Sequence, residues 1–150
     1  MDHSINRSKV LFVYQEEEEF KIESLWAIKE SEYYKIDNIP FFINNIAYED
    51  LINVEKDGED LYFDALINES GNSTLQLVIF NDSTQKQIGK RFEDLNCDWE
   101  GSHLPNYIAI NVPKEVNYSH IINVLNKGVN DGFWDYKEAC VSNNHKISIS

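Results

Sequence analysis

The sequence predicts an α+β protein with two structural halves. The N-terminal half is expected to be a small, bent β-sheet or barrel-like structure, packed on a C-terminal half of ferredoxin-like, split βαβ order with two helices. Short apolar segments alternate with turns in the first half, and helical stripes alternate with strands in the second. The charge also differs, because residues 1–75 hold 17 acidic and 6 basic side chains, whereas residues 76–150 hold 9 and 7. We therefore expect an acidic all-β half at 1–73 and a split βαβ half at 74–150, packed as one compact unit.

Five or six short strands are expected in the first half, followed by one that begins the second half. Residues 51–54 and 61–67 flank Asp57-Gly58, and an Asp-Gly pair favours the tight turn of a β-hairpin. The other expected strands are residues 10–14, 22–29, 33–36, 40–43 and 74–80.

Helices and strands alternate in the second half. Residues 81–83 are expected to cap a first helix, in which Ile88, Phe92 and Leu95 follow the spacing i, i+4, i+7. Residues 107–112 predict a strand that ends at Pro113.

A second helix is expected to begin after Asn117 and to end before Gly128. Its apolar face consists of Tyr118, Ile121, Ile122 and Leu125. A short helix over residues 133–141 and an alternating edge strand over residues 145–149 complete the expected order.

The composition excludes several classes of protein. The chain has 150 residues, of which 42% are hydrophobic and 13% aromatic, so a disordered protein is excluded. The net charge of −13 argues against binding to a nucleic-acid backbone or to an anionic membrane. No apolar segment approaches the ~20 residues of a membrane span, and the N-terminus lacks the layout of a signal peptide. We therefore expect a cytoplasmic protein.

Two cysteines and two histidines are the candidates for metal or nucleophilic chemistry. Cys97 and His103, and Cys140 and His145, lie five or six residues apart, but neither pair has the close Cys-Cys spacing typical of zinc sites. Cys97 with His103 as base, and with Asp98 or Glu100 nearby, would form a nucleophilic set, although acidic neighbours raise a thiol pKa. We expect buried, reduced thiols and no bound metal or cofactor.

Acidic side chains cluster in and beside the expected hairpin. The cluster consists of Asp50, Asp57, Glu59, Asp60 and Asp64. Turn acids are normally solvated, whereas a glycosidase pair needs one carboxyl group in an apolar environment. The polar loop at residues 70–74 could present backbone N–H groups to an anion, but a hairpin connection with Gly71 at positive φ explains it equally well.

Three segments carry a resemblance to a known family. They are Leu25-Trp26-Ala27, then Tyr34-Lys35-Ile36-Asp37-Asn38-Ile39-Pro40-Phe41-Phe42, then Ser70-Gly71-Asn72-Ser73-Thr74-Leu75. Together they resemble the bacterial domain-of-unknown-function family numbered 4265, and residues 107–113 and 128–136 are similar to later segments of that family. The chain departs from the family pattern at Glu49-Asp50, where Gly-Asp is favoured, and at Gln76, where Arg is favoured.

The resemblance implies no established activity, but some members of the family look like toxin-neutralising immunity proteins. The leading hypothesis is therefore a non-enzymatic immunity protein that occludes a cognate basic toxin, with charge steering the encounter. The alternatives are a regulator that binds a housekeeping enzyme through the ferredoxin-like half, and a cysteine-dependent enzyme. The sequence does not indicate the oligomeric state.

Two groups of residues follow from this hypothesis. The candidate partner-binding residues are Glu16, Glu17, Glu18, Glu19, Tyr33, Tyr48, Glu49, Asp50, Asp57, Glu59, Asp60 and Trp134. The family-motif residues with expected structural roles are Trp26, Asp37, Asn38, Pro40, Phe41, Gly71, Ser73 and Thr74. Among these, Asp37 and Asn38 are expected to hold a corner of the sheet and Trp26 to pack in the core beneath it.

Overall fold

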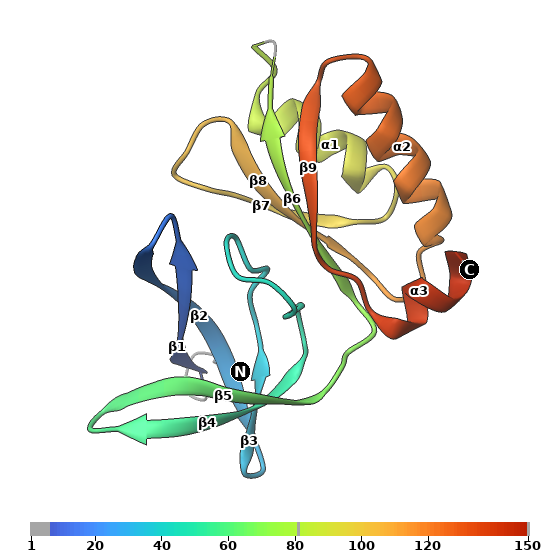
Figure 1. Ribbon diagram of the computed structural model, residues 1–150. Coiled ribbons are helices and arrows are strands. Elements are labelled where there is room, and N and C mark those ends of the chain that lie inside the picture. The colour runs from blue at the N-terminus through green and yellow to red at the C-terminus, as the bar shows by residue number, and fades with distance from the viewer. Residues whose placement is uncertain (1–6, 81, 150) are drawn as a thin grey trace.

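The computed structural model describes residues 7–80 and 82–149, which form two β-sheets and three short helices (Figure 1). The predicted α+β class is therefore confirmed. None of the helices in the described residues is long and apolar enough to cross a membrane.

The first five strands form a closed barrel, in which neighbouring strands are antiparallel and β1 closes on β5 in parallel. The strands are β1 (Arg7–Glu16), β2 (Glu19–Glu30), β3 (Tyr33–Ile36), β4 (Leu51–Asp57) and β5 (Asp60–Asn68). Strand residues alternate between the two faces of a sheet. Val10, Phe12, Leu25 and Ala27 therefore point inward and form the barrel core together with Ile52 and other apolar residues.

The remaining strands form a four-stranded antiparallel sheet in the order β7-β8-β6-β9. Its elements are β6 (Ser73–Ile79), α1 (Gln85–Glu93), β7 (Asp98–Gly101), β8 (Tyr107–Val112), α2 (Tyr118–Asn130), β9 (Trp134–Cys140) and α3 (Asn143–Ile149). One face of the sheet packs against α1 and α2 over a core that contains Leu77, Phe92, Ile110, Leu125 and Trp134.

Side-chain caps fix where both long helices begin. Thr84, rather than residues 81–83, caps α1. Thr84 and Gln87 form a capping box, in which the side chain of each residue accepts a hydrogen bond from the backbone N–H of the other. Asn81 lies outside the described residues. Asn117 caps α2 as predicted, but that helix continues past Gly128 to Asn130.

Three predicted elements were wrong. Residues 40–43 belong to a loop, residues 133–141 contain strand β9, and residues 145–149 belong to helix α3. The N-terminus of α3 is set by Ser142, whose hydroxyl accepts the backbone N–H of His145 at 3.2 Å. With this cap, residues 145–149 are helical despite their alternating sequence pattern. The side chain of His145 is buried against the rest of the protein, and that of Ile147 is exposed.

The loop at residues 37–50 lies between the barrel and the free face of the four-stranded sheet (Figure 1). Its backbone is bonded to the sheet: Asn45 N–H donates to Ala139 O at 2.8 Å, and Thr74 Oγ1 donates to Ile46 O at 3.1 Å. Gln76 is buried and has its Nε2 3.3 Å from both Pro40 O and Ile43 O. The loop therefore joins the two sheets into one structure.

Glu23 holds the other side of this loop. Its carboxylate, buried on β2, accepts the backbone N–H groups of Phe41, Phe42 and Ile43 at 2.7–3.1 Å. Hydrogen bonds to an ionised acceptor are the stronger kind. One buried carboxylate thereby fixes a segment that has no secondary structure of its own.

Candidate functional site

The outer face of the β1–β2 hairpin carries exposed apolar side chains. The strand register places Val13 opposite Ile22 and Gln15 opposite Phe20. Val13 and Ile22 are each 55% exposed and Phe20 is 76% exposed, because the alternate residues of the same strands fill the barrel. Contiguous apolar side chains on a surface are characteristic of an interaction site.

Four glutamates lie at the tip of the same hairpin. Glu17 and Glu18 form the turn with positive φ values of 50° and 68°, and Glu16 and Glu19 are the flanking strand residues. Among the described residues only one of the four forms an ion pair, that of Glu16 with exposed Lys21 at 3.6 Å. We call Val13, Phe20, Ile22 and Glu16–Glu19 the hairpin surface.

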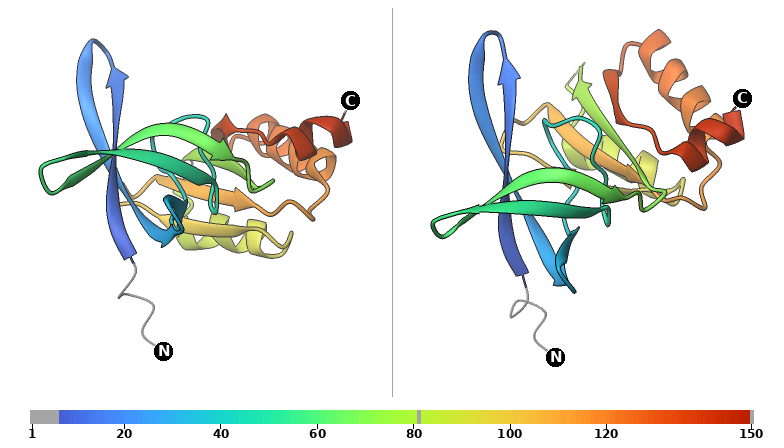
Figure 2. Two further views of the ribbon diagram at one scale, coloured as in Figure 1. Left: turned by 90° about the horizontal axis from the view of Figure 1, so that it is seen from below. Right: turned by 60° about the horizontal axis from the view of Figure 1, so that its bottom comes forward.

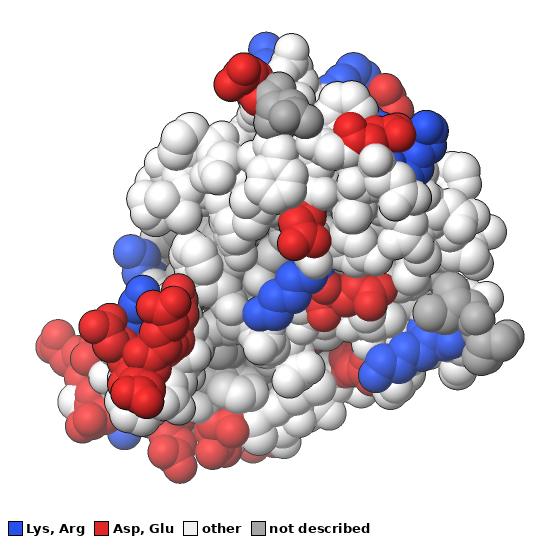
Figure 3. Space-filling view, turned by 45° about the horizontal axis from the view of Figure 1, so that its top comes forward, with Lys and Arg blue, Asp and Glu red and all other residues white. Residues whose placement is uncertain are grey.

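The second acidic cluster lies at a different tip. Asp57, Glu59 and Asp60 surround Gly58, whose φ of 64° suits the β4–β5 turn. Figure 3 shows the acidic side chains gathered over the barrel at the lower left, while acids and bases are interspersed elsewhere on that face. The β1–β2 and β4–β5 hairpins extend from the barrel in different directions (Figures 1 and 2), so the two clusters lie at the tips of two different hairpins.

Two candidate partner-binding residues are buried, and their assignment to a contact surface was wrong. Trp134 fills the core beneath α2 and donates its indole N–H to Leu125 O at 3.0 Å. Asp50 accepts the backbone N–H groups of Ala47 and Ser70, each at 2.9 Å. Burial raises the pKa of Asp50, while these hydrogen bonds lower it.

The prediction for Trp26 was wrong in the opposite sense. Trp26 was expected in the core, but its side chain is partly exposed on the outer face of β2. Its ring is covered by the guanidinium group of Arg7, 4.8 Å from the ring centroid, and by Lys9. Arg7 also forms an ion pair with Asp37 at 3.1 Å. The Oδ1 atom of Asn38 accepts the backbone N–H of Trp26 at 2.5 Å, so both residues of the Asp-Asn pair contact the end of the barrel.

The other family-motif residues hold the contact between loop and sheet. Phe41 O accepts the hydroxyl of Tyr107, and Pro40 O lies beside Gln76. Gly71 has a φ of 96°, and a Cβ there would meet the Lys114 side chain at 3.0 Å. Ser73 is bonded to His145 inside the protein.

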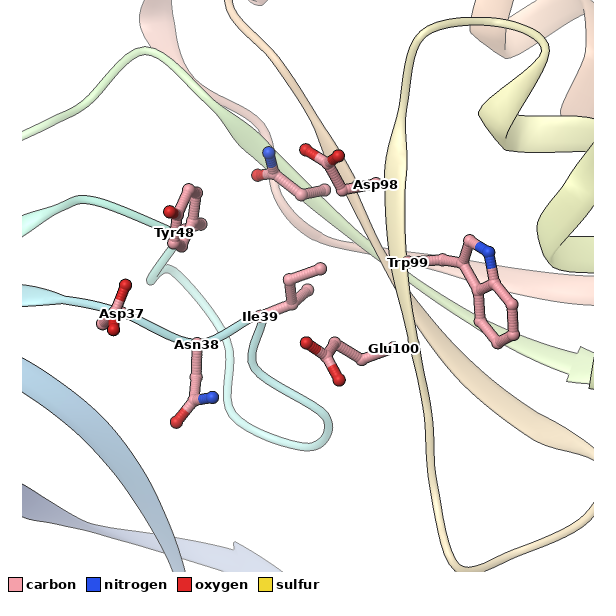
Figure 4. A pocket seen from close by; sticks show the side chains of 8 residues that line it. Asp37, Asn38, Ile39, Tyr48, Asp98, Trp99 and Glu100 are labelled. Atoms are coloured by element: carbon pink, nitrogen blue, oxygen red, sulfur yellow. The ribbon is translucent and has the colours of Figure 1, made fainter. Parts of the chain in front are cut away.

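A pocket of about 400 Å³ opens between the loop and the edge of the four-stranded sheet (Figure 4). Asp37, Asn38, Ile39 and Tyr48 line it from the loop side. Asp98, Glu100 and Asn111 line it from the sheet side. We call this space the junction pocket. Of the candidate partner-binding residues it contains only Tyr48; Glu49 is exposed on the neighbouring turn with a φ of 70°, and Tyr33 lies half-buried in β3.

Cys97 lies beside β7 but is unsuited to nucleophilic chemistry. Burial, together with the charge of Asp98, raises the pKa of its thiol to about 12, so the thiol is protonated at neutral pH. Burial raises the pKa of Cys140 to about 12 as well. No group of three or more His, Cys, Asp or Glu side chains in the described residues could hold a metal ion.

The sequence reasoning missed the apolar part of the hairpin surface and the sheet side of the junction pocket. Alternation along residues 10–16 and 19–30 was a usable signal, because Phe12 and Leu25 pointing inward place Val13 and Ile22 outside. No sequence pattern indicates that Asp98 and Asn111 are neighbours, because this depends on the register of β7 and β8.

Comparison with known proteins identifies the family of this chain and one protein of similar structure. The protein belongs to the family described as Domain of unknown function (DUF4265), which matches residues 23–136. It is also similar to a hypothetical protein from Neisseria gonorrhoeae of known crystal structure, with 27% sequence identity and a TM-score of 0.81 over 91% of this chain and 96% of that chain. No curated protein matches the sequence.

Proposed function

We propose that this protein is a non-enzymatic binding protein that captures a basic protein through the hairpin surface. The observation that carries the proposal is the exposed Phe20 side chain beside the Val13–Ile22 pair, directly next to four glutamates. Aromatic anchors of this kind supply much of the binding energy in protein interfaces. The glutamates favour a cationic partner and disfavour an acidic one.

The more specific form of this proposal is that the partner is a cognate toxin, which the hairpin surface occludes. Membership of a family of which some members look like immunity proteins, together with the net charge of −13, supports it. The raised pKa of the Cys97 thiol removes support from the alternative of a cysteine-dependent enzyme. We also infer that residues 73–140 have the ferredoxin-like topology, which the order β6-α1-β7-β8-α2-β9 and the sheet order β7-β8-β6-β9 support.

The test uses the product of the adjacent gene, purified as an inactive variant, and isothermal titration with three forms of this protein. We expect the wild type to bind and the F20S/I22S variant to lose at least about tenfold in affinity, because each anchor residue is worth ~1–2 kcal/mol or more. Ile147→Ser is the matched control, since Ile147 on α3 is 74% exposed, nearly as much as Phe20. Absence of wild-type binding, or equal loss in the control, would overturn the proposal.

Growth rescue separates the toxin form from the general one. Co-expression of the wild type with the active neighbouring product should restore growth, and the F20S/I22S variant should not. Binding without rescue would leave a binding protein but refute toxin neutralisation.

A further inference from the structure

Two carboxylates and one buried amide lie on the same face of the four-stranded sheet. Asp98 on β7 is the register partner of Asn111 on β8, and Glu100 is the partner of Ala109. Directly opposed residues of antiparallel strands hold their side chains on one face, with Cβ atoms ~4.5–5.5 Å apart. Figure 4 shows Asp98 and Glu100 turned toward Tyr48 and Ile39, while Trp99 between them points to the other side of the strand.

The hydrogen-bond acceptors on the sheet side of this pocket have no donors among the described residues. Asn111 is 2% exposed, and its Oδ1 has no hydrogen-bond partner in the part of the chain that the structure describes. Neither Asp98 nor Glu100 forms an ion pair with any described residue. An unsatisfied buried acceptor destabilises the protein, so a donor that reaches it is favoured.

The opposite wall adds negative potential and an aromatic ring. Tyr48 is half-buried there, and burial together with the charges of Glu49, Asp37 and Asp98 raises its hydroxyl pKa. Asp37 is already paired with Arg7, and Asn38 Oδ1 is already bonded to Trp26. On the sheet side of the pocket, the acceptors without a partner among the described residues are therefore the carboxylates of Asp98 and Glu100 and the amide oxygen of Asn111.

We propose that the junction pocket binds a guanidinium group. A guanidinium ion presents five N–H donors in a planar fan and can therefore serve two carboxylates and an amide oxygen together. It is also weakly hydrated and stacks on aromatic rings such as that of Tyr48. An ammonium group has only three donors and a higher cost of dehydration. The pocket volume of about 400 Å³ leaves room for the rest of an arginine-sized ligand.

The group could belong to a free guanidino compound or to an arginine residue of a protein, and the test has an arm for each. We would titrate the full-length protein with agmatine, with N-acetylarginine amide and with N-acetyllysine amide, and follow the amide resonances of residues 98–100 and the Asn111 side chain by NMR. We expect saturable shifts with the guanidinium compounds and at least about tenfold weaker binding of the lysine compound. Tighter binding of agmatine would indicate a free ligand, and tighter binding of the blocked arginine would indicate a protein side chain.

Two variants of equal charge locate the site. D98N/E100Q should weaken guanidinium binding by at least about tenfold, since it removes both charge-assisted contacts. E17Q/E18Q changes the net charge equally at the hairpin tip and should leave binding unchanged. The proposal is overturned if no saturable shift occurs in the wild type, if lysine binds as well as arginine, or if both variants weaken binding alike. Because this titration needs no protein partner, its outcome is separate from that of the hairpin surface.

Discussion

The Oγ atom of Ser73 lies 2.5 Å from Nδ1 of His145, although the two residues are 72 positions apart in the chain. Nε2 of the same imidazole lies 3.1 Å from Pro113 O, a carbonyl that can only accept, so the proton is on Nε2. Nδ1 therefore accepts the Ser73 hydroxyl proton, and Ser73 Oγ accepts the backbone N–H of Ser142 at 2.9 Å. This buried network needs a neutral imidazole and ties α3 to the start of β6.

Protonation of His145 should destabilise the protein. Burial lowers its pKa below 6.5, so the unfolded chain takes up a proton that the folded protein rejects. The contribution is fully present above pH ~6.5 and is lost as the pH falls through the lower folded pKa. Urea unfolding should therefore show a decrease in stability between pH 7.5 and 5.5 that is smaller in H145Q. An NMR titration of the wild type giving His145 a pKa of 6.5 or higher would contradict this prediction.

Replacing Glu23 by glutamine should release the loop at residues 37–50. The carboxylate accepts three backbone N–H groups, whereas glutamine offers one oxygen and turns an N–H₂ group toward the others. We expect a loss of about 2–3 kcal/mol in the free energy of unfolding, because buried donors lose charge-assisted partners. Chemical denaturation measures it, with E19Q at the exposed hairpin tip as the control that should stay within about 0.5 kcal/mol. A similar small change in both variants would show that Glu23 does not hold the loop.

Replacing Gly128 by alanine should destabilise the protein, even though alanine is favoured over glycine inside a helix. A Cβ there would lie 2.0 Å from Cζ2 of Trp134, and that ring is fixed by burial and by its hydrogen bond to Leu125. Alanine gains about 1 kcal/mol in helix propensity over glycine, but the overlap costs about 3 kcal/mol, the upper end of the range typical of overpacking. We expect Gly128→Ala to lower the unfolding free energy by about 2 kcal/mol. Asn123→Ala on the exposed side of the same helix should instead raise it by a few tenths.

Short sequence patterns predicted the elements whose ends are fixed by residues next to them in the chain. Asp57-Gly58 marked the β4–β5 turn, Asn117 marked the start of α2, and Pro113 followed the end of β8. The exchange of strand and helix after residue 132 was not predictable in this way, because the buried contacts of Trp134 and His145 come from distant parts of the chain. Residue type alone also gave wrong predictions of burial, since Trp26 is partly exposed beneath Arg7 and Trp134 is buried.

The candidate sites were predictable to different degrees. The glutamates of the hairpin surface stand out in the sequence as four consecutive acids. The junction pocket depends on the register between β7 and β8 and on the course of the loop at residues 37–50. Neither the register nor the course of the loop can be predicted from the sequence. The sequence therefore indicates Asp98 and Glu100 only as neighbours of Cys97.

The hairpin glutamates should control how fast the partner is captured rather than how tightly it is held. Exposed charges accelerate encounter over the ~8–10 Å range that physiological salt leaves unscreened. We expect E17Q/E18Q to slow association with the neighbouring gene product and to flatten its dependence on salt, with little change in dissociation rate. Thermal stability should not fall, since unpaired like charges at the tip repel one another. Stopped-flow measurements at two salt concentrations check this.

Neutralising the other tip is the matched control for this prediction. D57N/E59Q changes the net charge by the same amount on the β4–β5 hairpin, which extends from the barrel in a different direction (Figures 1 and 2). If the hairpin surface is the docking site, this variant should slow association less than E17Q/E18Q, because its charges act only through the long-range field. Equal slowing by both variants would mean that the net charge of the barrel steers the partner without a preferred tip. Identical rates for the wild type and E17Q/E18Q at both salt concentrations would leave the four glutamates without a role in binding.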